Sequence, residues 1–482
     1  MLPTDGVVAV VKRDCPTCDL VAPLLVDLRR AGHVGAVVCQ DDRGFPAGID
    51  VIDDSDLDLS WDLGIETVPT LLRLAGGREA ARAEGWSRAQ WEQLLGVTGI
   101  GRGLPDHRPG CGSATLDPGR ADALLVRHRG GILTSRRVEL GELEDPFEAM
   151  FDRGWSDGLP VVPPTEARVL RMLSGTTRDP AEVVAVVPPG LVACTVEKVA
   201  VNAVMAGCRP EYLPVVLASV EAACSDAFNA HGVLATTWSA GPLIIVNGPV
   251  ARAIGMNSTG NALGQGNRAN ATIGRALQLV IRNVGGGRPG PGGIDRAALG
   301  HPGKVGWCFA EDEEGSPWEP LSVSRGVAPG RSAVTLFAGS GATPFIDQLS
   351  RTPDSLVRTM AAVLRASAHP KLAPAFDCVL VVSPEHARVY RDAGWDRTRL
   401  LAELTDLLQL DAAGLTRGVG GIAEGMPAAL TAAGGQLPKF RPGGLLVVHA
   451  GGRAGMFSTV IPGWASGRTG SEPVTRPIDG PA

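Results

Sequence analysis

The stretch VVAVVKRDCPTCDLVAPLLVDLRRAG, Val7–Gly32, decides how the first part of this chain folds. It opens on a short apolar run rich in valine, which is typical of a buried strand. From Cys15 onward the apolar residues recur at helical spacing until Gly32, where a helix is expected to end. Cys15 and Cys18 therefore stand where a strand passes into a helix, one helical turn apart.

Strands and helices continue to alternate beyond this stretch. We predict a second strand over 34–41, a short helix over 55–64, a hairpin that turns at 76–77, and a last helix over 87–96. Trp91 and its neighbours Leu94 and Leu95 share one face of that last helix. The predicted order is βαβαββα, an α/β arrangement.

The CPTC motif carries the clearest chemistry. A thiolate at Cys15 would be stabilised by the amides and dipole of the helix that begins there. Cys18 lies one turn on and can resolve a mixed disulfide formed at Cys15, while Pro16 suits the first helical position. Half of a zinc site is the alternative, but no second CxxC exists in the sequence. We predict a redox-active Cys15–Cys18 disulfide.

With ETVPTLL (Glu66–Leu72) ahead of the hairpin, this motif resembles the thioredoxin family over about the first 96 residues. The resemblance implies that Pro69 is the family's cis-proline beside the redox pair. Two features depart from the family. The extra strand and helix with which thioredoxins usually begin are missing here, so the edge of the sheet where that strand would lie is either open or covered by the rest of the chain. The motif is CPTC in place of CGPC, which leaves the reduction potential open.

We predict three parts in the chain: a minimal thioredoxin-like domain over 1–98, a Gly/Pro-rich linker over 99–144, and a larger Gly/Pro-rich α/β domain over 145–482. The linker is expected to hold a β-hairpin over 123–140. It also holds Cys111, in PGCGSAT, between two glycines. Such a cysteine is either accessible to a partner thiol or an incidental surface residue.

The large domain is similar to the UGSC-type (seleno)protein family over about 145–464. The likeness rests on RGWSDGLPVVPPTEARV, VNAVMAGCRPEYLPVV, RANATIGRALQLVIRNVGGGRPG and LGHPGKVGWCFAEDEEGSPWEPL. Some members carry selenocysteine-Gly-Ser-Cys. Here CGSA has Cys111 where selenocysteine would stand, and no second cysteine. The resemblance implies thiol or selenol redox chemistry and gives no substrate.

The densest polar cluster of the large domain follows Gly300. His301, Cys308 and Glu311 are candidate catalytic residues there, because a histidine and carboxylates can act as base or hold a metal. A metal at His301, Glu311 and Glu313 is one possibility, and a solvated acidic turn is the alternative.

A Gly/Asn-rich loop ahead of a long helix suggests an anion site, and a tight structural loop is the alternative. It supplies part of the set of candidate substrate-binding residues: Asp157, His231, Asn261, Arg268, Arg275 and Lys304. Asp157 and His231 could equally serve as caps of turns or helices.

Composition limits the partners. A net charge of -6 argues against a basic surface that binds nucleic acid, and the apolar runs are too short to span a bilayer. No signal peptide is visible, and nine cysteines in 482 residues favour a reducing cytoplasm over a disulfide scaffold. We expect a small-molecule substrate, a thiol reductant or reductase system, and no certain cofactor beyond the disulfide. A homo-oligomer is a further option.

Three functions fit the sequence. The first is a thiol-dependent oxidoreductase, in which the CPTC domain supplies reducing equivalents to the large domain through Cys111, Cys308 or Cys208. The second is a lyase or hydrolase that uses His301 and Glu311, with the first domain as an accessory. The third is a redox-sensing adaptor.

Overall fold

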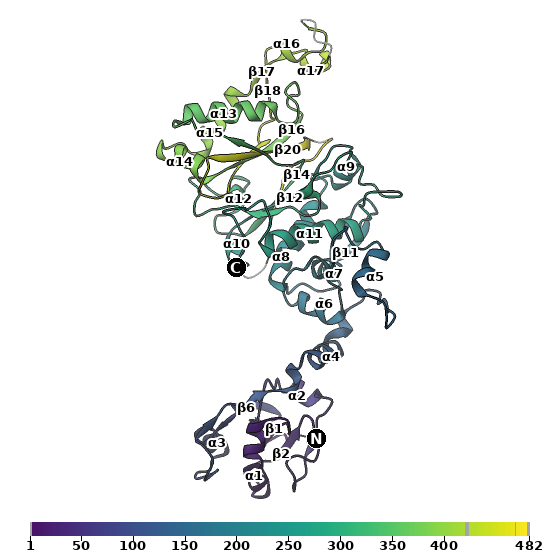
Figure 1. Cartoon of the computed structure of the whole chain (residues 1–482), viewed down its shortest axis with the longest axis vertical. Helices are drawn as coiled ribbons and strands as arrows, with labels where there is room; N and C mark the ends of the chain where they lie inside the picture. The colour runs from purple at the N-terminus through teal and green to yellow at the C-terminus, as the bar shows by residue number, and fades with distance from the viewer. Residues whose placement is uncertain (1, 420–423, 468, 480–482) are drawn as a thin grey trace. The chain divides into compact units, whose positions relative to one another are not determined.

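The computed structural model describes residues 2–419, 424–467 and 469–479 (Figure 1). The chain forms two compact units, Met1–Ile132 and Leu133–Ala482. The boundary between them falls within the segment that the sequence assigned to a linker. Most of that segment therefore belongs to the first unit.

The first unit is built on a five-stranded sheet in the order β3-β2-β1-β5-β6. β1 is parallel to β2 and antiparallel to β5, and β2 is parallel to the short β3. β3 thus covers the edge of the sheet that, from the sequence, could have been either unpaired or covered by the rest of the chain. Val21, Leu25 and Leu28 of α1 pack into the core with the strands. The bounds are β1 (Gly6–Val11), α1 (Pro16–Arg30), β2 (Ala36–Cys39), β3 (Ile52–Asp53), α2 (Asp58–Asp62), β4 (Thr67–Val68), β5 (Thr70–Ala75), β6 (Arg78–Glu84), β7 (Trp86–Ser87) and α3 (Arg88–Leu95).

The expected hairpin over 123–140 is wrong. Residues after α3 instead form β8 (His107–Arg108), β9 (Cys111–Gly112), a 3-10 turn (Ala114–Leu116), the helix α4 (Pro118–Arg129) and a second 3-10 turn (Gly130–Ile132). Pro118 starts α4, and basic residues fill its last turn, both of which favour a helix. Leu124 is buried against Leu57, so this apolar residue lies on the packed face of α4. Gly130 ends the helix.

The second unit repeats one strand pattern. Its eight-stranded sheet has the order β13-β12-β14-β20-β16-β19, with β15 paired to β20 and β21 to β14. β12 lies between a parallel β13 and an antiparallel β14. β16 likewise lies between a parallel β19 and an antiparallel β20. The two half-sheets meet where Gly339 pairs with Gly463.

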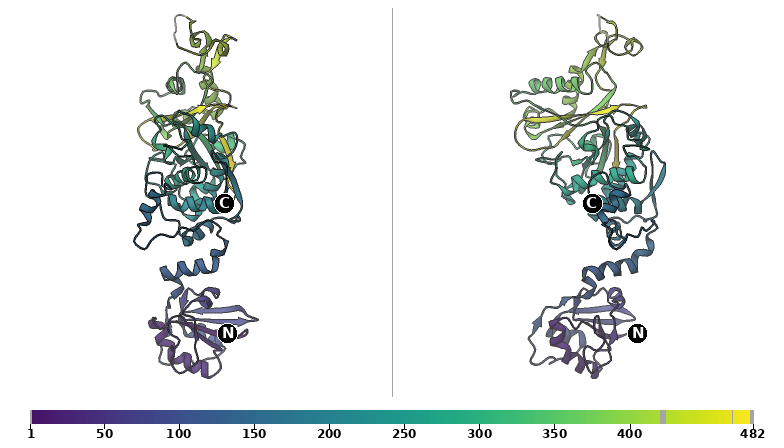
Figure 2. Two further views of the ribbon diagram at one scale, coloured as in Figure 1. Left: turned by 90° about the vertical axis from the view of Figure 1, so that its right-hand side faces the viewer. Right: turned by 45° about the vertical axis from the view of Figure 1, so that its right-hand side comes forward.

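Side chains that alternate along these strands separate two faces of each half-sheet. The inner faces pack on each other through one apolar cluster, formed by Leu243, Ile245, Phe309, Phe337, Val379, Val381, Leu446, Val448 and Ile461 among others. The outer faces pack on α7, α8 and α11 in one half and on α13, α14 and α15 in the other. The unit therefore has four layers, helix–sheet–sheet–helix, and Figures 1 and 2 show the helices on the outer sides.

The mixed α/β class predicted from the sequence is confirmed. Gly207 ends α7 ahead of Pro210 and α8, and Thr165 caps α6 by accepting from the Arg168 amide. The remaining bounds are α5 (Pro146–Asp152), α6 (Glu166–Leu173), β10 (Val183–Val187), β11 (Val192–Thr195), α7 (Val196–Ala206), α8 (Leu213–Ala223), α9 (Ala230–Ala235), β12 (Gly241–Asn247), α10 (Pro249–Ala253), α11 (Arg268–Asn283), β13 (Cys308–Ala310), α12 (Leu321–Ser324), β14 (Ala333–Gly339), β15 (Thr343–Ile346), α13 (Pro353–Ala366), β16 (Phe376–Val382), α14 (Pro384–Asp392), α15 (Arg397–Leu407), β17 (Gln409–Asp411), α16 (Ala412–Leu415), α17 (Ala428–Thr431), β18 (Gln436–Pro438), β19 (Leu445–His449), β20 (Phe457–Ala465) and β21 (Val474–Pro477). Within the described ranges, no helix combines the length and the apolar character needed to cross a membrane.

Candidate active site

The CPTC motif forms the start of α1, as predicted. Cys15 is the N-cap, and its Sγ accepts a hydrogen bond from the Cys18 amide at 3.3 Å. Pro16 occupies the first turn, where its missing amide hydrogen costs no bond. Both cysteines are buried, with Cys15 only 1% exposed.

The two cysteines are distinguished by their acidity. A hydrogen bond from the Cys18 thiol, helped by one from Cys111, lowers the pKa of Cys15 to about 5 although burial opposes this. Burial, followed by the hydrogen bond to Cys15, raises the pKa of Cys18. At neutral pH the arrangement holds a thiolate at Cys15 and a protonated thiol at Cys18, which are the states needed for attack and later resolution.

The segment that carries Pro69 lies beside Cys15. The Val68–Pro69 peptide bond is cis, which confirms the expectation for Pro69. Cys15 Sγ lies 3.5 Å from the Val68 carbonyl oxygen, to which it donates when protonated. Val68 belongs to β4, and β4 pairs antiparallel with β9, so that Val68 stands opposite Cys111.

Residues Pro109–Thr115, which we term the docked segment, are held across the motif. Thr17, inside CPTC, donates its hydroxyl to the Pro109 carbonyl oxygen at 2.8 Å. The Ser113 amide donates to the Glu66 carbonyl oxygen at 2.9 Å. Gln40 donates to the Ser113 hydroxyl at 2.7 Å and accepts from the amide of Ala114 at 3.0 Å. The segment is therefore fastened on both sides of Cys111.

Gly110 lets the docked segment approach β4 closely. A Cβ at this position would lie 2.3 Å from Thr67 Cγ2 and 2.8 Å from the Val68 carbonyl oxygen. At Gly112, two residues on, a Cβ would meet nothing within 4 Å. The two glycines that flank Cys111 therefore have different roles, and only Gly110 is required by packing.

The structure thus brings Cys15, Cys18, Pro69 and Cys111 together. Cys111 is half-buried, and burial, followed by its hydrogen bond to Cys15, raises its pKa. Sequence reasoning missed Thr17, Gln40 and Gly110 as parts of this site. The glycines around Cys111 were a usable signal for close backbone contact, whereas nothing in the sequence marks Gln40.

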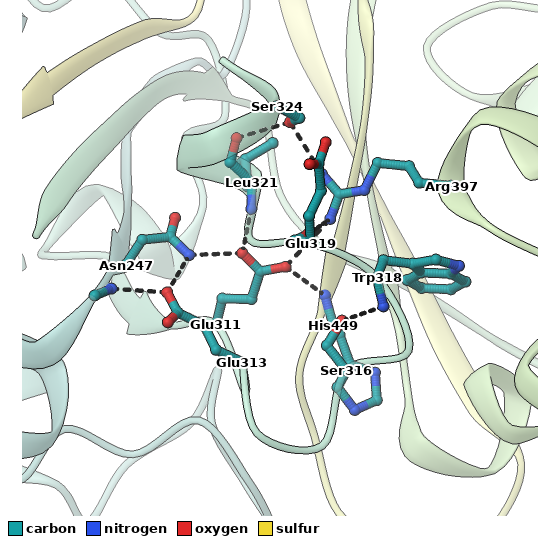
Figure 3. Close-up of polar contacts among 11 residues, drawn as sticks. Asn247, Glu311, Glu313, Ser316, Trp318, Glu319, Leu321, Ser324, Arg397 and His449 are labelled. Atoms are coloured by element: carbon teal, nitrogen blue, oxygen red, sulfur yellow. Dashed lines mark hydrogen bonds and ion pairs between the residues drawn. The ribbon is translucent and has the colours of Figure 1, made fainter. Parts of the chain in front are cut away.

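In the second unit, Glu311 follows β13 and lies in a buried polar cluster (Figure 3). Its carboxylate accepts from Asn247 Nδ2 and from the Leu321 amide, both at 2.7 Å. Arg397 Nη2 lies 3.5 Å from the other carboxylate oxygen. Glu313 accepts from the same Asn247 amide group at 2.9 Å, so Glu311 and Glu313 face one side. Burial raises the pKa of Glu311.

This cluster connects the two halves of the second unit. Glu311 belongs to the first half and Arg397, at the start of α15, to the second, and the Asp312 amide donates to the His449 carbonyl oxygen at 2.8 Å. The His449 ring is fully buried, and burial lowers its pKa. Because the side chains of Glu311 and Arg397 are both buried, the arrangement is that of a structural ion pair.

His301 lies at the opposite end of β12 from Glu311. Its Nε2 lies 3.2 Å from the Gly339 carbonyl oxygen, and Lys304 donates to Ala240, just before β12, at 3.0 Å. Glu311 instead contacts Asn247, the last residue of β12. A seven-residue strand spans about 20 Å, so the structure does not bring His301 to Glu311 and Glu313 as a shared metal or catalytic site. Among the described residues, no three His, Cys, Asp or Glu side chains form a group that could hold a metal ion.

The remaining predicted residues are scattered. Cys208 and Cys308 are buried in the core of the first half, and burial raises the pKa of Cys208 to about 12 and that of Cys308 further. His231 and Asn261 are exposed. Arg268 is exposed as well and donates to a backbone carbonyl oxygen, that of Gly207.

The Gly/Asn-rich loop uses its polar groups internally. Asn267 caps α11 by accepting from the Asn270 amide at 3.0 Å, and Asn270 donates to the carbonyl oxygen of Asn257 at 2.8 Å. Arg275 forms a two-bond ion pair with Asp157, at 2.7 and 2.8 Å. These contacts match the alternative of a tight structural loop.

Three predicted residues do meet in one place. Asp157, His301 and Lys304 line a cavity of about 560 Å³ beside α11, with Gln278 and Arg282 of that helix. This is a volume typical of a site for a small molecule.

No family model matches the chain, and no curated protein sequence matches it.

Proposed function

We propose that this chain is a thiol–disulfide oxidoreductase in which Cys15 and Cys18 exchange with Cys111 and so supply reducing equivalents for a reaction of the second unit on a small-molecule substrate. One observation carries the proposal. Cys111 is held within hydrogen-bonding reach of a Cys15 thiol whose pKa is lowered to about 5, beside the cis-proline.

The exchange has three balanced steps. The Cys111 thiol first exchanges with a small disulfide: it forms a mixed disulfide with one half and gives its proton to the other half, which leaves as a thiol. The Cys15 thiolate attacks the Cys111 sulfur, which forms a Cys15–Cys111 disulfide and releases the other thiolate. The Cys18 thiol then attacks Cys15, gives its proton to the departing Cys111 thiolate, and leaves a Cys15–Cys18 disulfide. An external dithiol restores the reduced pair.

Acidity supports this division of roles. A thiolate at Cys15 is ready to attack at neutral pH, and Cys18 stays protonated until it is needed. Once Cys15 is in a mixed disulfide, its negative charge is gone. Because that charge and its hydrogen bond are among the causes that raise the pKa of Cys18, its thiol becomes easier to deprotonate.

A hydrolase or lyase that uses His301 with Glu311 is not favoured by the geometry, because the two residues lie at opposite ends of β12. Cys208 and Cys308 are weaker candidates than Cys111 as electron acceptors, since both are buried in the apolar core of the second unit with raised pKa values.

Trapping tests the proposal. In Cys18→Ser, a disulfide formed at Cys15 cannot be resolved, so oxidation with a small disulfide should accumulate a Cys15–Cys111 bond, detected by peptide mass spectrometry. Cys18→Ser combined with Cys111→Ser should lack that bond. Cys39→Ser, which changes another cysteine of the first unit, should not prevent wild-type exchange. A trapped bond from Cys15 to a foreign thiol, with Cys111 left free, would refute the internal exchange.

A further inference from the structure

We propose that the cavity beside α11 binds a small carboxylic acid as its anion, with the carboxylate held by Arg282. The cavity measures about 560 Å³ and is lined from α11, from the loop over residues 287–305 and from Asp157. It lies wholly within the second unit and shares no residue with the thiol site. The failure of one proposal therefore leaves the other standing.

Arg282 is the cation of this cavity that has no ionic partner. Among the described residues it makes no ion pair, and its Nε is buried without an acceptor. Burial lowers the pKa of Arg282, and the negative charge of Asp157, which Arg275 already binds, offsets this only in part. An anion bound beside it would relieve the remaining cost of burying this charge.

The other charged groups that line the cavity are already paired. Lys304 Nζ lies 2.9 Å from Asp295, and Asp157 is bound by Arg275 at 2.7 Å. Arg288, a further cation near Arg282, is exposed and is not among the lining residues. The cavity thus offers one uncompensated positive charge.

One charge in a planar guanidinium matches one carboxylate, which it can bind through two parallel hydrogen bonds. A phosphate dianion would leave a second negative charge without a cation in a half-enclosed site. The charge count therefore favours a monocarboxylate over a phosphate.

Two further polar side chains line the cavity. Gln278, one turn before Arg282 on α11, has an amide nitrogen that donates to no acceptor among the described residues; it is closed to solvent and reaches a ligand only when the side chain turns. His301 donates through Nε2 to the Gly339 carbonyl oxygen at 3.2 Å, and burial lowers its pKa, so Nδ1 of the neutral ring is an acceptor. Neither group adds a charge.

The rest of the wall is apolar. Leu299 is 94% exposed and Val305 is 40% exposed, and both line the cavity. Apolar side chains left open beside a cavity can be covered by an apolar part of a ligand. The ligand class is therefore a monocarboxylate with a short apolar body.

Isothermal titration of the full-length reduced protein tests the site, with butyrate as the probe and acetate, succinate and inorganic phosphate as comparisons. We expect saturable binding of butyrate that weakens about tenfold or more in Arg282→Gln, since a charge-assisted pair is lost. Arg282→Lys should keep weakened binding. Arg358→Gln removes an exposed arginine of α13 that does not line the cavity, and should bind as wild type does.

Three outcomes would overturn the proposal. The first is no saturable binding of any carboxylate to the wild type. The second is tighter binding of phosphate than of butyrate, which would exclude the carboxylate class. The third is butyrate binding that Arg282→Gln and Arg282→Lys both leave unchanged, which would place the ligand elsewhere. Circular dichroism of each variant separates a binding defect from misfolding.

Discussion

Gly110→Ala should loosen the docked segment and expose Cys15 while the first unit stays folded. The added Cβ would lie 2.3 Å from Thr67 Cγ2 and 2.8 Å from a backbone oxygen, that of Val68. The backbone oxygen cannot move aside cheaply because Val68 is fully buried in the core of the first unit. The segment must therefore shift away from β4.

The size of the effect follows from the contacts that hold the segment. Five hydrogen bonds, made by Thr17, Ser113, Gln40 and Thr115, fasten it in addition to its pairing with β4. At about 1 kcal/mol each they keep the segment closed for all but a small fraction of the time. Overpacking that costs about 1–3 kcal/mol would raise the open fraction about 5- to 150-fold.

The rate at which a maleimide alkylates Cys15 measures that open fraction. Because Cys15 is 1% exposed, reaction requires opening. At about pH 6 most other thiols are protonated, and peptide mass spectrometry identifies the site of reaction. Gly112→Ala is the matched control, since its Cβ would meet nothing within 4 Å, and its rate should stay within about twofold of wild type. Adding Thr67→Ser to Gly110→Ala should recover part of the protection.

Equal alkylation rates in wild type and Gly110→Ala would refute the view that the docked segment shields Cys15. So would equal acceleration by both glycine variants, because that would reflect general loosening of the linker and not the contact with β4.

Two further predictions concern acidity and the buried ion pair. The ultraviolet absorbance of the Cys15 thiolate should appear as pH rises through about 5, so exchange should be fast at neutral pH and slow in acid. Cys111→Ala should raise the pKa of Cys15 because one hydrogen bond to the thiolate is lost. A midpoint near the ordinary cysteine value would contradict the geometry. Glu311→Gln should lower the free energy of unfolding, measured in urea, by about 3–5 kcal/mol because Arg397 is left buried without its counter-ion. Glu314→Gln should lower it by less than about 1 kcal/mol, because the Glu314 side chain is 73% exposed in its ion pair with Arg252. Equal losses would mean that burial does not govern the cluster.

Local features of the fold could be predicted from the sequence. The passage from β1 into α1 is encoded by a valine run, a capping cysteine and a helical repeat that follow one another along the chain. The hairpin between β5 and β6, at Gly76 and Gly77, is equally local. The segment after Gly96 was harder, because α4 and a hairpin both explain apolar residues flanking two glycines.

Contacts between distant segments could not be predicted. The pairing of Val68 with Cys111 depends on how a Gly/Pro-rich stretch folds back on β4, and no periodicity encodes that. His301 and Glu311 are close in sequence, but they lie before and after β13, a strand too short to recognise. Treating CFA as a strand would have placed them at opposite ends of it.

The repeated strand pattern of the second unit has a consequence for how such a chain could arise. Each half is a helix-backed sheet whose inner face consists of large apolar side chains, which water would contact if the half stood alone. A single ancestral half could have hidden that face only against another copy of itself. In this view the second unit corresponds to two copies of one fold joined in a single chain, and Glu311 of one half pairs with Arg397 of the other.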